Sequence, residues 1–176
     1  MNKNILKSSL CSVAVCSQET ILKETGAEAT LREVKIVNLP QETLVIKMDS
    51  VRFHGLFKDK WGFNKHCDYA LVTDSEVVFV ELKSRNELTD NMRNDCEKKF
   101  QSDICTIEYA DAIFANLLSK NKFFINRKKH YVVFYQALSV SKTPTQTKDK
   151  KANNSPETFR PIAIQNQGTI RFEMIL

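Results

Sequence analysis

The chain has 176 residues, of which 42% are hydrophobic, enough for one domain with its own core. Its four glycines and four prolines exclude a fibrous or largely disordered protein, and no apolar run approaches the roughly 20 residues of a membrane span. The formal net charge of +5 is compatible with a polyanionic partner. We therefore expect a single domain over residues 1–176, with residues 1–30 as a helix-and-strand appendage.

The five cysteines are odd in number, and their spacing fits no zinc-binding motif. Apolar neighbours surround Cys67, Cys96 and Cys105, which are therefore expected to be buried thiols. Free thiols indicate a reducing compartment, so the predicted location is the cytoplasm. The apolar stretch at residues 10–16 is short and interrupted, which argues against a secretory signal.

The N-terminal third predicts one helix and one hairpin. Residues 17–28 are expected to form the helix, with Ser17 as its N-cap. Apolar and charged residues alternate over 30–38, which predicts a half-exposed strand. A turn around Pro40 and a second apolar run at 43–48 complete the predicted hairpin.

Basic and aromatic residues are interleaved over residues 49–65. Aromatic faces stack on bases and cations contact phosphates, so this pattern suits nucleic-acid binding. The alternative is that the aromatic rings belong to the core and the charges to the solvent side. The predicted nucleic-acid contacts are Lys58, Lys60 and Lys65, together with Arg85 further along the chain.

The strongest pattern is a predicted hairpin formed by residues 69–72 and 77–82, preceded by Asp68. Glu81 and Lys83 lie two residues apart near its end, so they share one face of the strand while the residue between them points into the core. Burying charged groups on so apolar a strand is costly unless they have partners or a function.

The second half of the chain predicts a helix crossing between two strands. Apolar residues at helical spacing predict an amphipathic helix over 89–119, and residues 131–138 read as a buried strand parallel to the preceding one. The apolar stripe of the helix comprises Met92, Cys96, Phe100, Ile104, Ile107, Phe114 and Leu117. Residues 141–158 have almost no apolar content and predict a mobile basic loop. Residues 160–165 and 169–176 predict a terminal hairpin.

Asp68 followed by Glu81-Leu82-Lys83 resembles the signature of the PD-(D/E)xK nuclease superfamily. That signature places an Asp at the start of one strand, a short hairpin, and Glu-x-Lys on the next strand. Cys67 stands where the family usually has a proline. The resemblance is firm over residues 68–83, extends in outline over 53–139, and implies a restriction-endonuclease-like α/β (mixed α+β) fold, with a central mixed sheet flanked by helices.

The resemblance also implies a function, the hydrolysis of phosphodiester bonds by a divalent-metal-dependent nuclease acting on DNA more than on RNA. Asp68, Glu81 and the backbone carbonyl of Leu82 would hold Mg²⁺ or Mn²⁺, and Lys83 would hold the attacking water and offset the phosphate charge. Many relatives of this size act in mobile elements or host defence, including antiviral defence. The chain has neither a recognition domain nor a P-loop, so a homodimer or a targeting partner is expected.

Two further groups are implied less directly. Relatives place an additional acid in the N-terminal region, where Glu19, Glu28, Glu33 and Glu42 are equal candidates. Relatives also carry a Gln on the helix after the Glu-x-Lys strand, which corresponds here to Gln101, either a catalytic group or a surface residue. His66 shares a strand face with Asp68, as an outer partner of the site or as a histidine at the rim of the sheet.

The sequence leaves two readings beside the enzyme. One is a non-catalytic nucleic-acid-binding or assembly subunit that keeps the nuclease-like fold. The other is a protein interaction module whose charged residues simply sit at the rim of a sheet, where solvent covers them.

Overall fold

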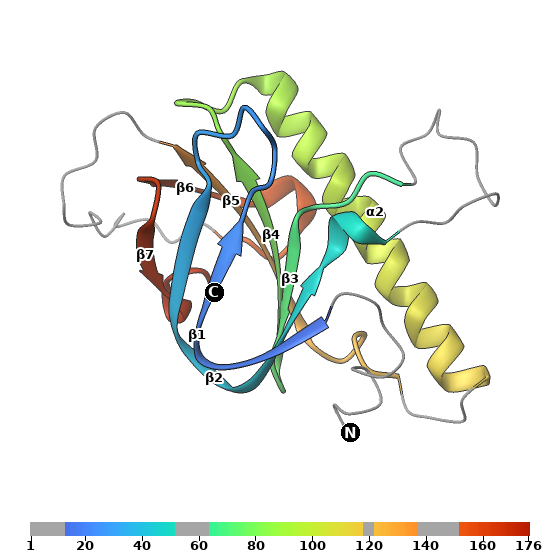
Figure 1. The fold of residues 1–176 in the computed structure, drawn as a ribbon. Helices are drawn as coiled ribbons and strands as arrows, with labels where there is room; N and C mark the ends of the chain where they lie inside the picture. The colour runs from blue at the N-terminus through green and yellow to red at the C-terminus, as the bar shows by residue number, and fades with distance from the viewer. Residues whose placement is uncertain (1–12, 52–63, 118–121, 137–151) are drawn as a thin grey trace.

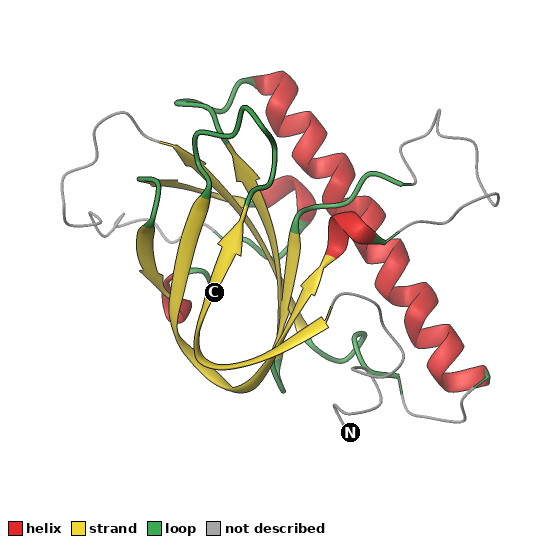
Figure 2. Ribbon diagram, in the orientation of Figure 1, coloured by secondary structure: helices red, strands yellow, loops and turns green. Residues whose placement is uncertain are grey.

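The computed structural model describes residues 13–51, 64–117, 122–136 and 152–176. They form one mixed sheet with a long α-helix packed diagonally across one face (Figures 1 and 2). Two of the predicted nucleic-acid contacts, Lys58 and Lys60, lie outside the described residues. No helix in the described ranges is long and apolar enough to cross a membrane.

The sheet has seven strands in the order β1-β2-β3-β4-β5-β6, with β7 paired to β2. Neighbours from β1 to β4 are antiparallel, whereas β4 with β5, β5 with β6 and β2 with β7 are parallel. The strands are β1 Val13–Lys23, β2 Glu33–Lys47, β3 Tyr69–Val72, β4 Glu76–Lys83, β5 Lys128–Gln136, β6 Arg160–Ile164 and β7 Gly168–Arg171. The helix is α2 Asp90–Asn116, and short 3-10 turns lie at η1 Met48–Ser50, η3 Pro156–Thr158 and η4 Phe172–Met174.

The N-terminal predictions were wrong in a consistent way. The expected helix at 17–28 is strand β1, and the expected hairpin is one 15-residue strand, β2, that runs through Pro40. Positive φ angles at Asn38 and Glu42 bend β2 instead of reversing it, and a register shift around Gln18 lets β1 follow the bend. The turn residues therefore mark a bulged bend, because β1 pairs with both halves of β2.

The central predictions were confirmed. Strands β3 and β4 form the expected antiparallel hairpin, α2 follows, and β5 pairs parallel to β4. Thr89 caps α2 by accepting a hydrogen bond from the Met92 N–H. Two details differ: Leu117 follows the end of the helix and is 76% exposed, and Cys105 lies on the exposed side of α2.

The sheet has a hydrophobic core on each face. Successive side chains of β4 point alternately into one core and the other. Val77 and Phe79 pack toward α2, whereas Val78, Val80 and Leu82 pack on the opposite face. That opposite core is closed by the bent sheet itself and by C-terminal residues such as Phe172, Ile175 and Leu176. Helices were expected on both faces of the sheet, but among the described residues a helix covers only one face. On the other face, the bend of the sheet and the C-terminal residues cover the core.

The C-terminal predictions were met in part. A tight turn does connect β6 and β7, where the Gly168 N–H donates to the Gln165 carbonyl, but β6 pairs with β5 and β7 with β2, so the two strands are no hairpin. Residues 141–151 of the predicted basic loop lie outside the described residues, and the described remainder, 152–158, is packed on the domain. Asn153 is buried, donates from its side chain to the Ile175 carbonyl, and faces His130 on β5.

Asp111 on α2 anchors the segment that leads into β5. Its buried carboxylate accepts hydrogen bonds from the backbone N–H groups of Phe123, Phe124 and Ile125, at 2.5–2.9 Å. We expect Asp111→Ala to lower the free energy of unfolding by about 3 kcal/mol, because it leaves buried donors unpaired. Urea denaturation measures this, with Glu108→Ala on the exposed side of α2 as control. An equal, small loss in both variants would contradict the assignment.

Candidate active site

Asp68, Glu81 and Lys83 meet at the rim of the sheet where β3 begins and β4 ends. Tyr69 pairs with Val80, so extending the register by one residue places Asp68 opposite Glu81. The Asp68 N–H donates to the Val80 carbonyl at 3.1 Å, and the Leu82 N–H donates to Asp68 Oδ2 at 2.6 Å. The strand ladder itself therefore holds the two carboxylates side by side, on the face of the sheet that carries α2.

Glu81 is the buried centre of this group, with 1% of the residue exposed. One oxygen, Oε1, lies 2.8 Å from Lys83 Nζ and 2.6 Å from Lys99 Nζ. The other, Oε2, is also buried, and no donor among the described residues bonds to it. A buried carboxylate oxygen without a donor is unfavourable unless it meets a ligand.

Asp68 is held in an environment that disfavours its charge. Burial raises the pKa of its carboxyl from 3.8 to about 8, with a further contribution from the negative charge of Glu81. The Leu82 N–H and the Lys99 ammonium oppose this but are outweighed. Without a bound cation, Asp68 is therefore largely protonated at neutral pH.

Helix α2 supplies a second row of charged groups at intervals of four residues. Asp95, Lys99 and Asp103 all face the sheet, one turn apart. Asp95 lies 3.5 Å from Lys83 Nζ and 3.3 Å from Lys65 Nζ. Burial is the largest single influence and acts to lower the pKa values of Lys83 and Lys99. The charge of Glu81, the hydrogen bond to it and smaller effects of neighbouring groups together outweigh burial and raise both pKa values, so the two ammonium groups stay charged.

Asp103 fixes the segment that leads into Asp68. Its side chain is fully buried, lies 2.8 Å from His66 Nδ1, and accepts the Cys67 backbone N–H at 3.1 Å. The His66 ring therefore packs on α2 and is buried, which differs from a position at the solvated rim. Its contact with Asp103 makes it a support for the approach to Asp68.

Gln101 does not join the cluster. It is exposed on α2, and its amide donates to Glu97 at 3.2 Å and to Glu157 at 3.5 Å. A residue two positions after Lys99 on a helix is turned by about 200° away from it, which explains the separation. Gln101 therefore lies away from the candidate site, contrary to the catalytic position predicted for it.

The four N-terminal acids also lie elsewhere. Glu19 pairs with Lys35 at 2.9 Å and Glu33 with Lys23 at 3.0 Å, while Glu28 and Glu42 are exposed. The N-terminal acid whose charge acts on Asp68 is instead Glu24, directly after β1.

Glu24 is not among the four predicted acids, although it lies between two of them, Glu19 and Glu28. Its Oε1 accepts the Gly26 N–H at 2.9 Å, which fixes the side chain within the turn after β1.

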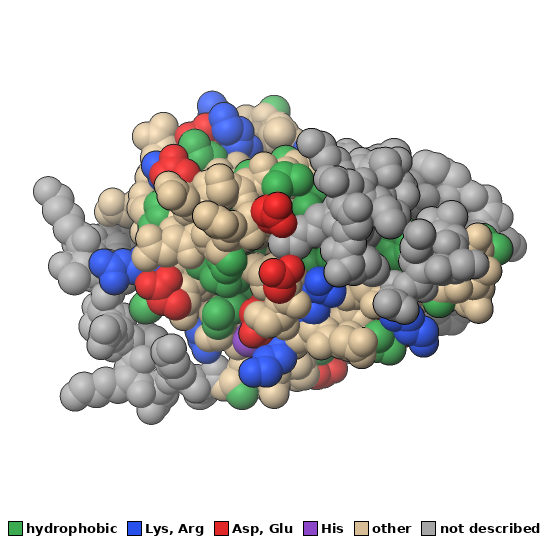
Figure 3. Space-filling model, turned by 90° about the horizontal axis from the view of Figure 1, so that it is seen from below, with side chains coloured by type: hydrophobic (Ala, Val, Ile, Leu, Met, Phe, Trp, Pro, Cys, Tyr) green, Lys and Arg blue, Asp and Glu red, His purple; other side chains and the backbone are tan. Residues whose placement is uncertain are grey.

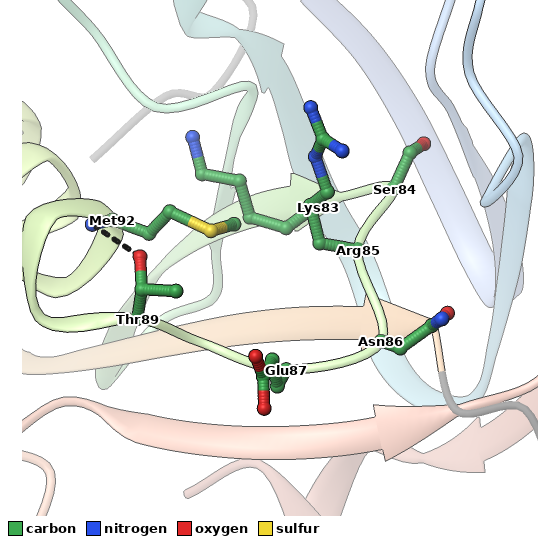
Figure 4. A pocket seen from close by; sticks show the side chains of 7 residues that line it. All are labelled: Lys83, Ser84, Arg85, Asn86, Glu87, Thr89 and Met92. Carbon is green, nitrogen blue, oxygen red and sulfur yellow. Dashed lines mark hydrogen bonds between the residues drawn. The ribbon is translucent and has the colours of Figure 1, made fainter.

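The face of β4 that carries Glu81 and Lys83 continues outward to Arg85. Lys83 and Arg85 line an open hollow of about 810 Å³ together with Ser84, Asn86, Glu87, Thr89 and Met92 (Figure 4). Their side chains extend to one side of the loop, away from Glu87. Lys83, beside the buried Glu81, and the exposed Arg85 therefore place positive charge along one side of the hollow.

A different face of the molecule provides a comparison. In the view from below, the described Lys and Arg side chains are scattered among acidic and apolar ones and do not gather into a patch (Figure 3). On that face, the described residues offer no group of cations comparable to Lys83 and Arg85.

Scans against known protein families, curated proteins and solved structures find no match to this chain. Within the described ranges, no group of three or more His, Cys, Asp or Glu side chains is arranged to hold a metal ion. The case for a site therefore depends on the two carboxylates and the lysines around them.

Lys99 and Asp95 are the members of the cluster that the sequence analysis missed. A signal for them was present: each stands one residue before a buried member of the apolar stripe, Cys96 or Phe100. Charged residues four apart, directly beside an apolar stripe, lie at the edge of the helix face that packs on the sheet. They are therefore the helix residues best placed to meet charges at the end of β4.

Proposed function

We propose that this chain is a divalent-metal-dependent nuclease that hydrolyses phosphodiester bonds of DNA. The observation that carries the proposal is the pair of a half-buried Asp68 and a buried Glu81 at one rim of the sheet, with Lys83 beside them and Glu81 Oε2 lacking a donor among the described residues. Ordinary charges at a sheet rim would be solvated, whereas Glu81 is 1% exposed.

The donor set suits a hard cation. Asp68, Glu81 and the Leu82 carbonyl would offer oxygen ligands only, which Mg²⁺ and Mn²⁺ prefer, and Mg²⁺ keeps several waters when few side chains bind it. Such a cation would supply hydroxide at neutral pH and neutralise charge on the phosphate. Glu81 Oε2 is the atom that would gain most from a bound cation, since this oxygen is buried without a donor in the described part of the chain.

The residues around the pair have separate roles in the proposal. Lys83 touches Glu81 but keeps 18% of its side chain exposed, so its ammonium can also hold a water or a phosphate oxygen. Arg85, further out on the same side, would bind a neighbouring phosphate by its planar fork of donors. Lys65 is exposed close by and adds positive charge near the rim.

Cleavage assays test this proposal. Supercoiled plasmid, linear duplex, single-stranded DNA and single-stranded RNA of the same sequence are incubated with the purified chain in Mg²⁺, Mn²⁺ or EDTA. We expect cleavage of DNA with either cation and none in EDTA. No cleavage of any substrate over a range of protein concentrations, which also covers a dimeric enzyme, would reject the enzyme.

A second candidate is a non-catalytic nucleic-acid-binding or assembly subunit. It is favoured by one observation: the charges of the cluster already balance without a metal, since Lys83 and Lys99 offset Glu81 and Asp95, and the pKa of the Asp68 carboxyl is about 8. In that case a salt-dependent gel shift would be seen without cleavage and would persist in Glu81→Gln. Loss of the shift in Arg85→Ala would place that binding at the same rim.

A further inference from the structure

Lys99 occupies a position that the proposed reaction does not explain. Its Nζ lies 2.6 Å from Glu81 Oε1, closer than Lys83 Nζ at 2.8 Å, and 20% of its side chain is exposed. It comes from α2, whereas Lys83 comes from β4 beside Glu81 itself. Two elements therefore deliver a cation each to the same oxygen.

One ammonium is enough to neutralise one carboxylate, and Lys83 already does so. A second ammonium on the same buried oxygen brings two positive charges to Glu81, the charge that a divalent cation carries. Two cations held close together repel each other unless anions surround them, and Asp95, whose pKa is lowered by these lysines, provides negative charge beside Glu81.

We infer that Lys99 competes with a divalent cation for Glu81: it holds the carboxylate while the cation is absent and releases it when the cation binds. The inference rests on the proposed function in one respect, that a divalent cation is expected at Glu81. It adds a role for a residue outside the Asp68, Glu81 and Lys83 signature. Asp95 lies one helical turn before Lys99 on the same face and can accept the released ammonium, as i,i+4 pairs on helices do.

The test is the affinity of the metal-free protein for Mn²⁺, measured by calorimetry or by the electron paramagnetic resonance of free Mn²⁺ without nucleic acid. Lys99→Met removes the competing charge and keeps the length of the side chain. We expect it to bind Mn²⁺ at least about tenfold more tightly than the natural chain, since a neighbouring charge changes the ion affinity of a carboxylate by that order.

The matched control is Lys98→Met, the neighbouring exposed lysine. It makes the same change in net charge, and its Mn²⁺ affinity should stay within about twofold, as for a screened surface charge. Lys99→Gln is a milder variant that should change the affinity in the same direction and serves if Lys99→Met does not fold. Lys99→Arg keeps the charge and should leave the affinity close to that of the natural chain.

The outcomes separate the two claims. If Lys99→Met and Lys99→Gln bind Mn²⁺ no more tightly than Lys98→Met, while the natural chain binds Mn²⁺ and cleaves DNA, the inference is overturned and the proposed function stands. If the natural chain and all variants neither bind Mn²⁺ nor cleave DNA, both are overturned. Tighter binding confined to the Lys99 variants supports the inference.

Discussion

Glu81→Gln is expected to reduce divalent-dependent cleavage of DNA by at least about a hundredfold. The amide has the shape of the carboxylate but no charge, so it cannot hold a cation against the phosphate. It also removes the anion on which Lys83 and Lys99 converge. The rate of product formation at saturating Mn²⁺ measures the loss, and Mn²⁺ affinity in the same preparation should fall with it.

The matched control for this change is Glu97→Gln on α2. Glu97 is half-buried and hydrogen-bonded to Gln101, away from the cluster, so the same loss of one negative charge should leave cleavage nearly unchanged. Cleavage that survives in Glu81→Gln at the rate of the Glu97 variant would mean that the activity belongs to another site or to a contaminant.

Asp68→Asn is expected to make the metal-free protein more stable, by about 2 kcal/mol at pH 8 in EDTA. An amide oxygen can still accept the Leu82 N–H, and it removes a carboxyl whose charge is disfavoured by burial and by Glu81. Functional groups held at a cost in stability behave in this way when they are replaced. Urea denaturation of the folded variants measures the difference.

The pH dependence of this gain has a definite sign. The pKa of Asp68 is about 8 in the folded chain and near 3.8 when unfolded, so between these values the folded state holds one more proton. Its stabilising contribution is complete below pH 3.8 and is lost as the pH rises toward 8, at up to about 1.4 kcal/mol per pH unit. The stability of Asp68→Asn relative to the natural chain should therefore rise steadily from pH 5 to pH 8.

The control is Asp74→Asn, an exposed residue in the turn at the other end of the same hairpin. It should show neither the gain nor its increase with pH. An Asp68→Asn variant that is less stable than the natural chain at pH 8 would mean that the carboxylate is charged and well paired in the folded protein, contrary to the environment described for it.

The part of the fold that the sequence predicts is the part whose signals are local. The β3–β4 hairpin has two apolar runs separated by polar residues, and α2 has a long apolar stripe with a capping residue at Thr89. The prediction for the N-terminal strands was wrong because Asn38 and Pro40 are typical of turns. These residues form a bend within one strand because β1 pairs with both halves of β2. Such pairing between separate segments cannot be recognised from the residues around Asn38 and Pro40 alone.

The site divides in the same way. Spacing by two along β4 predicts that Glu81 and Lys83 share a face, and the hairpin register brings Asp68 opposite Glu81. The contact of Lys99 with Glu81 depends on how α2 is rotated about its axis against the sheet. An error of two residues along the helix turns a side chain to the other side, as the exposed position of Gln101 shows. The position of Glu24 depends on where β1 ends, and the helix predicted over 17–28 gave no reason to prefer Glu24 to Glu19 or Glu28.

The most direct test of the account is a crystal of the metal-free chain soaked in Mn²⁺ and measured for anomalous scattering. We expect a peak between the carboxylates of Asp68 and Glu81, in contact with Glu81 Oε2, and a Lys99 ammonium moved away from Oε1. A fully soaked crystal with no peak there, in which Lys83 and Lys99 still hold Glu81 as they do without metal, would contradict it.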